Sequence, residues 1–596
     1  MGVDRRALAM GLGWCAVAVA CDAPLVASPD GATDAQSARL PLEPSPPLPP
    51  EPVQIDGCPP GWRARAIDER TTVCEPWEGE RAPDCAPDEL AIPGVGCERV
   101  DECPPDGWPR DLPTVGVVHV RAGEIGGDGS RERPFGTLAE GLAAARGRDV
   151  ILALAAGEYE GGSALGMYNR ELRGACASGT VIHDPETGLD QAALTVYVTG
   201  ARMSGVRIVG GTRALWLAGD ASVEATNLVL EGSFGGLRLD PGASFDGDRV
   251  RVSGGREGAA GLSIHLRPRS RLLLRRSTIL GGVHAAIGAY ANASDPPRLE
   301  IAVTLEDSAV LDAREAVSGF VSDVIIRRSV LERLAGGVYV GPGGSAELTD
   351  VRARDVQPLP GGFDAAVFGT AGQGTAARLW VSDAAQPALS AGGAGARLVA
   401  ADLVVEGYPG GATVLAAKDE GTLEVSRAVL RDSAASAIEA TDDGAVVVTD
   451  LDVVDTVGGA MPDPLVWGRA GTVTLSRARA RSLGRTFAVA AAGARIDASD
   501  VDVEGGSGLI AECAPEVDLG CDPGAESHLA LARARLRGVR RFGVAFERAR
   551  GSVRDLLVEG WRAAVRTAAA SVCTSEGSSR RSASTSVAAR ATRSFS

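Results

Sequence analysis

Few residues in this chain have the types and the spacing of a catalytic site. Asp442 and Asp443 form an adjacent carboxylate pair. Glycoside hydrolysis uses two carboxyl groups at a defined separation, one as acid and one as base or nucleophile. Gly444 follows the pair, so a solvated turn is the simpler interpretation. We therefore predict no catalytic residue.

The histidines do not have the spacing of metal ligands. There are five of them, namely His119, His183, His265, His284 and His528. If the chain forms stacked coils, His265 and His284 could lie near one another on adjacent coils, but two unrelated surface positions are the simpler interpretation. We expect neither a bound metal nor a cofactor.

Arginines are dense in one stretch of the chain. They are Arg267, Arg269, Arg271, Arg275 and Arg276. Interspersed on strands, they are predicted to face solvent, and they could form a basic stripe for an anionic glycan. The net charge of the whole chain is −17, which argues against nucleic acid as a general partner.

A repeat organises the residues on either side of these groups. Apolar and polar residues alternate from Leu215, break at Gly and Asp, alternate again, and restart at Leu237. Alternation with period two indicates half-buried strands, and the Gly and Asp clusters indicate turns. A recurrence of about 22 residues is typical of a stacked solenoid. A β-propeller is the alternative, but its blades need about 40 residues or more.

The repeat predicts a parallel β-helix with three short strands per coil. Further coil starts are expected near Leu262, Ile287, Val317, Val338, Val367, Leu389, Val414, Ile438, Leu465, Val489, Leu509, Val544 and Val565. Inward positions carry Val, Leu, Ile and Ala, and outward positions carry Arg, Asp and Glu. Asn169, Asn227 and Asn292 are the only asparagines, so long asparagine ladders at the corners are excluded.

A short helix is predicted at the start of the solenoid. Thr137 and Glu140 have the spacing of a capping box, and Gly147 is a natural stop. Leu138 and Leu142 share one face. We expect this helix to cover the first coil, whose core and strand edges would otherwise be exposed.

This entry region resembles a known class of domain. Gly-Asp-Gly-Ser, Arg-Pro-Phe-Gly-Thr-Leu-Ala-Glu, Val-Ile-Leu-Ala-Leu and Gly-Glu-Tyr occur in this order between residues 127 and 159. The order is similar to the start of right-handed parallel β-helix (pectin-lyase-like) domains. With the cysteine-rich module and the export signal described below, the chain resembles uncharacterised myxobacterial-type lipoproteins. The resemblance implies right-handed coiling and residence at the cell surface or in the periplasm.

The resemblance carries no catalytic residue to this chain. Enzymes on this fold usually act on acidic polysaccharides. The hydrolase motifs Asn-x-Asp, Gly-His-Gly and Arg-Ile-Lys are absent from the sequence, as is the Asp-Pro-His-Asp motif of alginate epimerases. His183, Asp184 and Pro185 share only the letters of the last motif. A lyase would instead need several carboxylates for Ca²⁺ and a base to abstract a proton.

The N-terminus has the pattern of an export signal. Residues 1–20 combine a positive start at Arg5 and Arg6 with an apolar stretch that is too short to span a bilayer. Ala18-Val19-Ala20-Cys21 resembles a lipobox, which implies lipidation of Cys21, although the lipobox prefers Leu where Ala18 stands. Ordinary cleavage after Ala-x-Ala is the alternative. The Pro-rich remainder of residues 21–56 is predicted to be a linker.

Residues 57–110 are predicted to form a small disulfide module. It contains Cys58, Cys74, Cys85, Cys97 and Cys103, and because five is odd, Cys176 is the candidate sixth partner. A zinc site is the alternative, but the module has no CxxC pair and no nearby histidine. A further disulfide candidate joins Cys513 and Cys521.

The predicted fold class is all-β. A right-handed parallel β-helix solenoid with a short N-terminal capping helix spans residues 115–566, and a disordered Ser/Arg-rich tail spans 567–596. The tail is either native or the product of a shifted reading frame.

The predicted function is non-catalytic. We expect an outer-membrane or surface lipoprotein, with the periplasm as an alternative, that is attached to the membrane by its lipid. It would bind polysaccharide or an envelope protein, mediate adhesion or serve a structural role, and a divergent polysaccharide lyase or glycoside hydrolase is the alternative. An enzyme should place several carboxylates or arginines on one face of successive coils. A glycan-binding protein should stack exposed aromatic residues there, although aromatic residues make up only 4% of the chain.

Overall fold

The computed structural model describes residues 46–560 except for short gaps. The gaps are 55–56, 163–165, 169, 185–191, 211, 255–260, 290–299, 320–321, 359–365, 409–411, 434–435, 455–462, 513–525, 540–542 and 548. The export signal, Cys21, the pair Cys513 and Cys521, the predicted start at Val565 and the C-terminal tail lie outside these residues. No helix among the described residues is long and apolar enough to cross a membrane.

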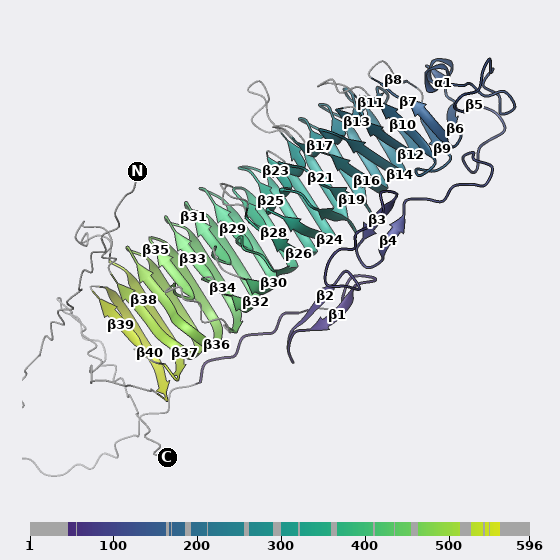
Figure 1. Cartoon of the computed structure of the whole chain (residues 1–596). Helices are drawn as coiled ribbons and strands as arrows, with labels where there is room; N and C mark the ends of the chain where they lie inside the picture. The colour runs from purple at the N-terminus through teal and green to yellow at the C-terminus, as the bar shows by residue number, and fades with distance from the viewer. Residues whose placement is uncertain are drawn as a thin grey trace, which may run out of the picture. The chain divides into compact units, whose positions relative to one another are not determined.

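The predicted fold class is confirmed as an all-β parallel solenoid of about 15 turns (Figure 1). Each coil contributes three strand segments, which form three faces of the stack. The first face contains β8 (Gly166–Met167), β11 (Ala192–Val196), β13 (Arg213–Leu217), β15 (Gly235–Leu239), β17 (Leu262–Leu266), β20 (Ala285–Ala289), β23 (Glu315–Gly319), β25 (Gly336–Val340), β27 (Phe368–Thr370), β29 (Leu389–Gly392), β31 (Leu415–Lys418), β33 (Ile438–Thr441), β35 (Val466–Arg469) and β39 (Val544–Glu547).

The second and third faces are shared by long strands that bend at a corner. They are β12 (Ala201–Gly210), β14 (Ser222–Gly232), β16 (Ser244–Gly254), β24 (Asp323–Leu334), β26 (Ser345–Val356), β28 (Gln373–Ser382), β30 (Arg397–Tyr408), β32 (Thr422–Ser433), β34 (Ala445–Val454), β38 (His528–Arg537) and β40 (Arg550–Glu559). β36 (Thr472–Ala491) and β37 (Arg495–Glu512) bend again and continue into the first face.

Shorter strands complete these two faces near the start of the stack. The second face also contains β5 (Val117–Val120), β6 (Ile151–Leu154), β9 (Glu171–Gly174), β18 (Arg271–Arg275) and β21 (Ala302–Glu306). The third face also contains β7 (Gly157–Glu160), β10 (Thr180–Asp184), β19 (Thr278–Leu280) and β22 (Ala309–Leu311).

The predicted coil starts fall at or within two residues of one register column. Leu215 pairs with Leu237, Leu237 with Ile264, and the column continues through Ile287 and Val317 toward the last coils. These side chains point inward and are fully buried. In a stack of this kind, contacts between adjacent coils are enough to bury the apolar side chains, because each coil contacts mainly its neighbours.

The corner between the second and third faces is built from charged residues in the left-handed conformation. From Arg276 onward it alternates strictly, as Arg276, Asp307, Arg328, Asp350, Arg378, Asp402, Arg427, Asp450, Arg477, Asp500, Arg533 and Asp555, and every one of these residues has φ between 46° and 63°. Positive φ costs a non-glycine residue roughly 1–2 kcal/mol. Here that cost is offset by ion pairs between neighbouring coils.

Each corner arginine from Arg328 to Arg533 binds the aspartate of the preceding coil with two hydrogen bonds. Arg427 donates Nε to Asp402 Oδ1 (2.7 Å) and Nη2 to Asp402 Oδ2 (2.9 Å), and Arg328 does the same to Asp307 at 2.7 and 2.9 Å. Bidentate guanidinium–carboxylate pairs are strong and directional. We call this column the Asp–Arg corner ladder. The sequence has too few asparagines for long asparagine ladders at the corners, and at this corner aspartate and arginine form the ladder instead.

Helix α1 (Leu138–Ala145) lies against β5 and β6 at the start of the stack, as predicted. Thr137 Oγ1 accepts the N–H of Glu140 (3.2 Å), and the Glu140 carboxylate accepts the N–H of Thr137 (3.1 Å), which completes the capping box. Leu138 and Leu142 are buried in the solenoid core. The helix therefore covers the apolar interior of the first coils.

The cysteine-rich segment contains two small hairpins and three disulfides. β1 (Arg63–Ala66) pairs with β2 (Thr72–Glu75), and β3 (Glu89–Ile92) pairs with β4 (Gly96–Arg99), both antiparallel. The disulfides join Cys58 to Cys74, Cys85 to Cys97, and Cys103 to Cys176. Cys176 is therefore the sixth partner, and it links the module to the solenoid.

The module covers the outer surface of the third face instead of forming a separate domain. Trp380 and Val404 point outward from this face and are buried beneath Trp62, Val73 and other apolar residues of the module. The apolar contact is reinforced by buried charge. Glu332, which is 1% exposed, accepts hydrogen bonds from Trp77 Nε1 (3.3 Å), the Ala82 N–H (2.9 Å) and Arg333 Nη1 (3.1 Å).

Candidate functional site

The residues proposed from the sequence do not meet in one site. Asp442 and Asp443 both have positive φ (51° and 62°) in the turn between β33 and β34, where the sequence predicted a solvated turn. The register aligns His265 with Gly288 in the next coil, so His284 lies elsewhere along that coil. Arg275 and Arg276 bind Asp246 and Asp248 of the preceding coil. These two arginine side chains therefore form ion pairs within the solenoid.

One residue cluster has the geometry to hold a metal ion among the described residues. It consists of Cys85, Glu89 and Cys97, but these two cysteines are joined to each other in a disulfide, so they offer no thiolate ligand. His183 Nδ1 lies 3.1 Å from the Tyr159 carbonyl oxygen, and His119 Nδ1 lies 3.3 Å from that of Gly129. These two histidines therefore contact backbone groups.

His265 is the histidine most affected by its surroundings. It lies on the first face between Arg238 and Gly288. Burial lowers its pKa to about 3, and the positive charges of Arg213, Arg238 and Arg267 contribute. His265 is therefore neutral at physiological pH.

A neutral, half-buried histidine should make stability depend on pH. In the unfolded chain the imidazole takes up a proton near pH 6.5, whereas in the folded protein it does so only near pH 3. The unfolded state therefore binds more protons in this window, and stability falls as the pH is lowered from about 6.5 toward 3, by at most about 1.4 kcal/mol per pH unit. We expect His265→Gln to reduce the pH dependence of the urea-unfolding midpoint, measured between pH 7 and 4. His284→Gln is the matched control, and an equal slope for both variants would contradict the prediction.

Charged residues line a groove on the second face. Four of them are in register along the stack and line a cavity of about 400 Å³, namely Glu171, Arg202, Glu224 and Asp246. Several carboxylates and arginines thus share one face of successive coils, which is the arrangement expected of an enzyme. Glu224 and Asp246 are adjacent in register on neighbouring strands, whose backbones lie about 4.8 Å apart. Retaining glycosidases likewise use two neighbouring carboxyl groups.

Arginines bind two of the carboxylates that line the groove. Glu171 is bound by Arg173 (2.5 Å), and Asp246 is bound by Arg275 (2.9 Å). Glu224 is exposed and forms no ion pair with any described residue. A general acid usually keeps its proton through burial or a nearby like charge. Glu224 and Asp246 are thus adjacent carboxylates in register, of which only Asp246 is paired with an arginine.

Aromatic side chains stack on the first face near the start of the solenoid. The rings of Tyr168 and Tyr197 lie 5.0 Å apart with an interplanar angle of 7°, and the two residues are 38% and 46% exposed. Gly166 makes room for both rings, because a Cβ there would lie 2.8 Å from each. Ala218 follows at the register position of Tyr197 in the next coil, so only a methyl group stands beside that ring.

Arginines lie over two of the aromatic rings in this part of the first face. The guanidinium of Arg146 lies 4.4 Å from the Tyr168 ring centre, and that of Arg238 lies 4.5 Å from the Trp216 ring centre. Trp216 belongs to the coil that follows Tyr197, and Arg238 pairs with Trp216 in register. We call Arg146, Tyr168, Tyr197, Trp216 and Arg238 the aromatic strip. The sequence analysis did not identify these residues, because they come from five separate parts of the chain.

A larger cavity lies where the module meets the solenoid. It has a volume of about 1010 Å³ and is bordered by Asp84 of the module and by Asp312, Arg314 and Asp355 of the coils. Asp312 is bound by Arg333 through two hydrogen bonds of 2.6 and 2.8 Å, and the pKa of Arg333 is raised by this carboxylate. The cavity is therefore polar and charged at its rim.

No family model and no curated protein sequence matches this chain. Among solved structures, the chain is similar to the catalytic domain of a GH87 alpha-1,3-glucanase in complex with nigerose, with 11% identity, 77% of this chain and 70% of that chain covered, and a TM-score of 0.28. A variant of that domain gives 12% identity, the same coverage and a TM-score of 0.25.

Proposed function

We propose that this protein is an exported, surface-attached glycan-binding β-helix without catalytic activity. The observation that carries the proposal is the aromatic strip. A sugar presents an apolar face of C–H groups, which packs against an aromatic ring, and the exposed guanidinium of Arg146 can bind its oxygen atoms or carboxylates. Tyr197 offers a ring next to an alanine methyl group, and Trp216 lies in the following coil.

Export is supported by the disulfides. Three of them hold the N-terminal region, and such bonds persist in oxidising compartments outside the cytosol. Attachment through a lipid on Cys21 is part of the proposal and rests on the sequence pattern alone. Mass spectrometry of the native protein tests it, because a diacylglycerol-modified N-terminal Cys21 supports attachment, whereas an unmodified N-terminus contradicts it.

Binding should depend on Tyr197. We expect Tyr197→Ala to weaken retention on immobilised polysaccharide about tenfold, because removal of the exposed ring leaves the sugar without its stacking partner, at a cost of roughly 1–1.5 kcal/mol. A panel of acidic and neutral polysaccharides, read by affinity electrophoresis, measures the effect. Tyr339→Ala is the matched control, since Tyr339 is also 46% exposed on the first face but stacks on no other aromatic ring among the described residues. Equal retention of the two variants would count against the strip.

A glycoside hydrolase or lyase is the second candidate, and the register of Glu224 beside Asp246 is the observation that favours it. Release of reducing ends or of unsaturated products from any polysaccharide on the panel would support catalysis. Loss of that release in Glu224→Gln, with retention unchanged, would assign it to the groove. Retention without turnover supports the binding module.

A further inference from the structure

The Pro-rich segment ahead of the module lies along the Asp–Arg corner ladder. The N–H of Leu48 donates to Asp500 Oδ1 (3.2 Å), that of Glu51 to Asp450 Oδ1 (2.9 Å), and that of Gln54 to Asp402 Oδ1 (2.8 Å). These donors are spaced by three residues, and their acceptors are the aspartates of every second coil. The segment was expected to be part of a linker, so the contact is a feature that the sequence analysis missed.

The geometry of the two partners explains the match. Prolines at positions 46, 47, 49, 50 and 52 favour the polyproline II conformation, which advances about 3.1 Å per residue. Three residues therefore cover about 9.3 Å. Two coils at about 4.8 Å each cover about 9.6 Å. The three donors belong to residues that are not proline, so every one of them has an N–H to offer.

The aspartates are well prepared to accept these bonds. Each is fixed by a corner arginine of the next coil, as in Arg477 with Asp450 and Arg533 with Asp500. The hydrogen bond from Arg533 lowers the pKa of Asp500, and the Leu48 N–H lowers it too, against the opposing effect of desolvation. A carboxylate that is already ionised and held in place accepts an N–H at little further cost.

Two other contacts hold the same segment. Arg70 of the module donates Nη2 to the Pro50 carbonyl oxygen (3.0 Å), and Val53 is 8% exposed within the apolar cluster under the module. The segment is thus bound along the solenoid and at the module. We call residues 46–54 the strap.

We infer that the strap sets the orientation in which the protein is displayed, by fixing the coil at which its N-terminal segment departs. The strap runs from Asp500 back toward Asp402, against the order of the coils. The chain before Pro46 therefore leaves beside the coil of Asp500. This inference rests on the proposed surface attachment, and it adds which end of the solenoid is held.

The consequence concerns the aromatic strip. Tyr197 and Trp216 lie near the start of the stack, a dozen coils before Asp500, which is about 60 Å at about 4.8 Å per coil. Without the strap, the chain would depart at the module, where Trp62 packs on Trp380, near the middle of the stack. The strap moves the held point toward the last coils. The strip then lies at the end of the solenoid that is farther from the held point.

Energy transfer on vesicles tests this orientation. The chain from residue 22 onward, with a hexahistidine tag at its N-terminus, is bound to phosphatidylcholine vesicles that contain nickel-chelating lipid and an acceptor dye. In a chain whose Cys513, Cys521 and Cys573 are replaced by serine, a donor dye is placed at Glu504→Cys near the last coils or at Arg202→Cys near the first, where the native side chains are 52% and 65% exposed. We expect at least twofold higher transfer from position 504.

The strap is then disabled without disturbing its conformation. Leu48→Pro, Glu51→Pro and Gln54→Pro together delete the three donated hydrogens while the polyproline II conformation is retained. We expect this triple variant to remove the difference between the two donor positions. The matched control replaces the same three residues by alanine, which keeps all three N–H groups, and should behave as the unmodified chain.

The outcomes separate this inference from the proposed function. Equal transfer from both positions in the unmodified chain, or an unchanged difference in the triple-proline variant, would overturn the role of the strap. The glycan-binding proposal is read independently, because retention of the triple-proline variant in solution should equal that of the unmodified chain. Failure of Tyr197→Ala to weaken retention would leave the energy-transfer result intact.

Discussion

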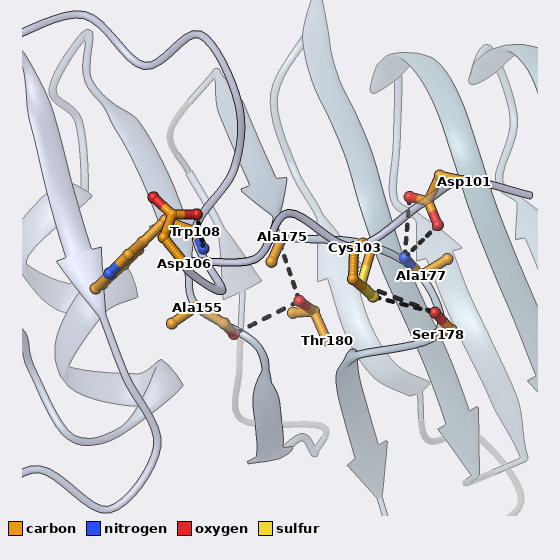
Figure 2. The surroundings of a disulfide bond; sticks show 10 residues. Asp101, Cys103, Asp106, Trp108, Ala155, Ala175, Ala177, Ser178 and Thr180 are labelled. Carbon is orange, nitrogen blue, oxygen red and sulfur yellow. Dashed lines mark hydrogen bonds between the residues drawn. A yellow bond between two sulfur atoms is a disulfide. The ribbon is translucent and has the colours of Figure 1, made fainter.

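Replacing Cys103 and Cys176 by serine is expected to lower the free energy of unfolding by about 4 kcal/mol, because this bond closes a long loop in the unfolded chain. The two cysteines are 73 residues apart in sequence. Figure 2 shows that the bond lies beside a second link, in which both Asp101 carboxylate oxygens accept the Ala177 N–H at 2.9 and 3.0 Å. Urea unfolding under oxidising conditions measures the loss.

A shorter disulfide provides the matched control. Cys85 and Cys97 are only 12 residues apart and lie within the module, so their replacement by serine should cost less, about 3 kcal/mol. Only the Cys103–Cys176 replacement should also speed amide exchange around Ala177 on the solenoid side. If both double variants lost the same stability with the same exchange pattern, the long bond would not join the module to the coils as the structure indicates.

Trp380→Ala is expected to cost about 3–5 kcal/mol, the usual range for removal of a fully buried tryptophan side chain. Trp380 is completely buried although it points away from the solenoid core, and its ring centre lies 5.9 Å from that of Trp62. The loss should therefore fall on the contact between the module and the third face. We expect limited proteolysis to cleave the module of this variant first, while the coils remain protected.

Trp467→Ala is the control for this experiment. Trp467 also points outward, but from the first face, and it is only half-buried. Its replacement should leave the cleavage rate of the module unchanged. Equal protection of the module in both variants would show that Trp380 does not hold it.

The buried charges beneath the module make its position specific. Arg352 is enclosed at this contact and reaches Ser382 Oγ (3.0 Å) and Glu75 (3.4 Å), and burial lowers its pKa. Glu332 lies nearby with partners from the module and the coils. An unpaired buried charge is costly, so a shifted module would lose more than apolar contact.

The repeat by itself determined the fold of this protein. Alternating residues between Leu215 and Leu237 predicted strands, and the recurrence predicted a parallel stack, because each coil needs only its neighbours to bury its apolar side chains. Thr137 and Glu140 likewise predicted the capping helix, since a capping box is satisfied within a single turn. Such features depend on residues that are close in sequence or repeated at one period.

The Asp–Arg corner ladder was present in the sequence as well. One Asp or Arg precedes the apolar residues of the third face in every coil from Arg276 on, and the two types alternate. The signal is visible only after the coils are aligned in register, because side chains more than twenty residues apart form each pair. From composition alone, we could predict only that this corner contains no long asparagine ladder.

Only the tertiary structure decided where the module, the strap and the aromatic strip lie. The module covers the third face because outward apolar residues such as Trp380 need a cover there. The strap binds because three-residue steps of a Pro-rich chain match two coils, a match between segments about 350 to 450 residues apart. Tyr168, Tyr197 and Trp216 look like scattered aromatic residues in the sequence. Stacking of the coils brings the two tyrosine rings together and places Trp216 in the following coil.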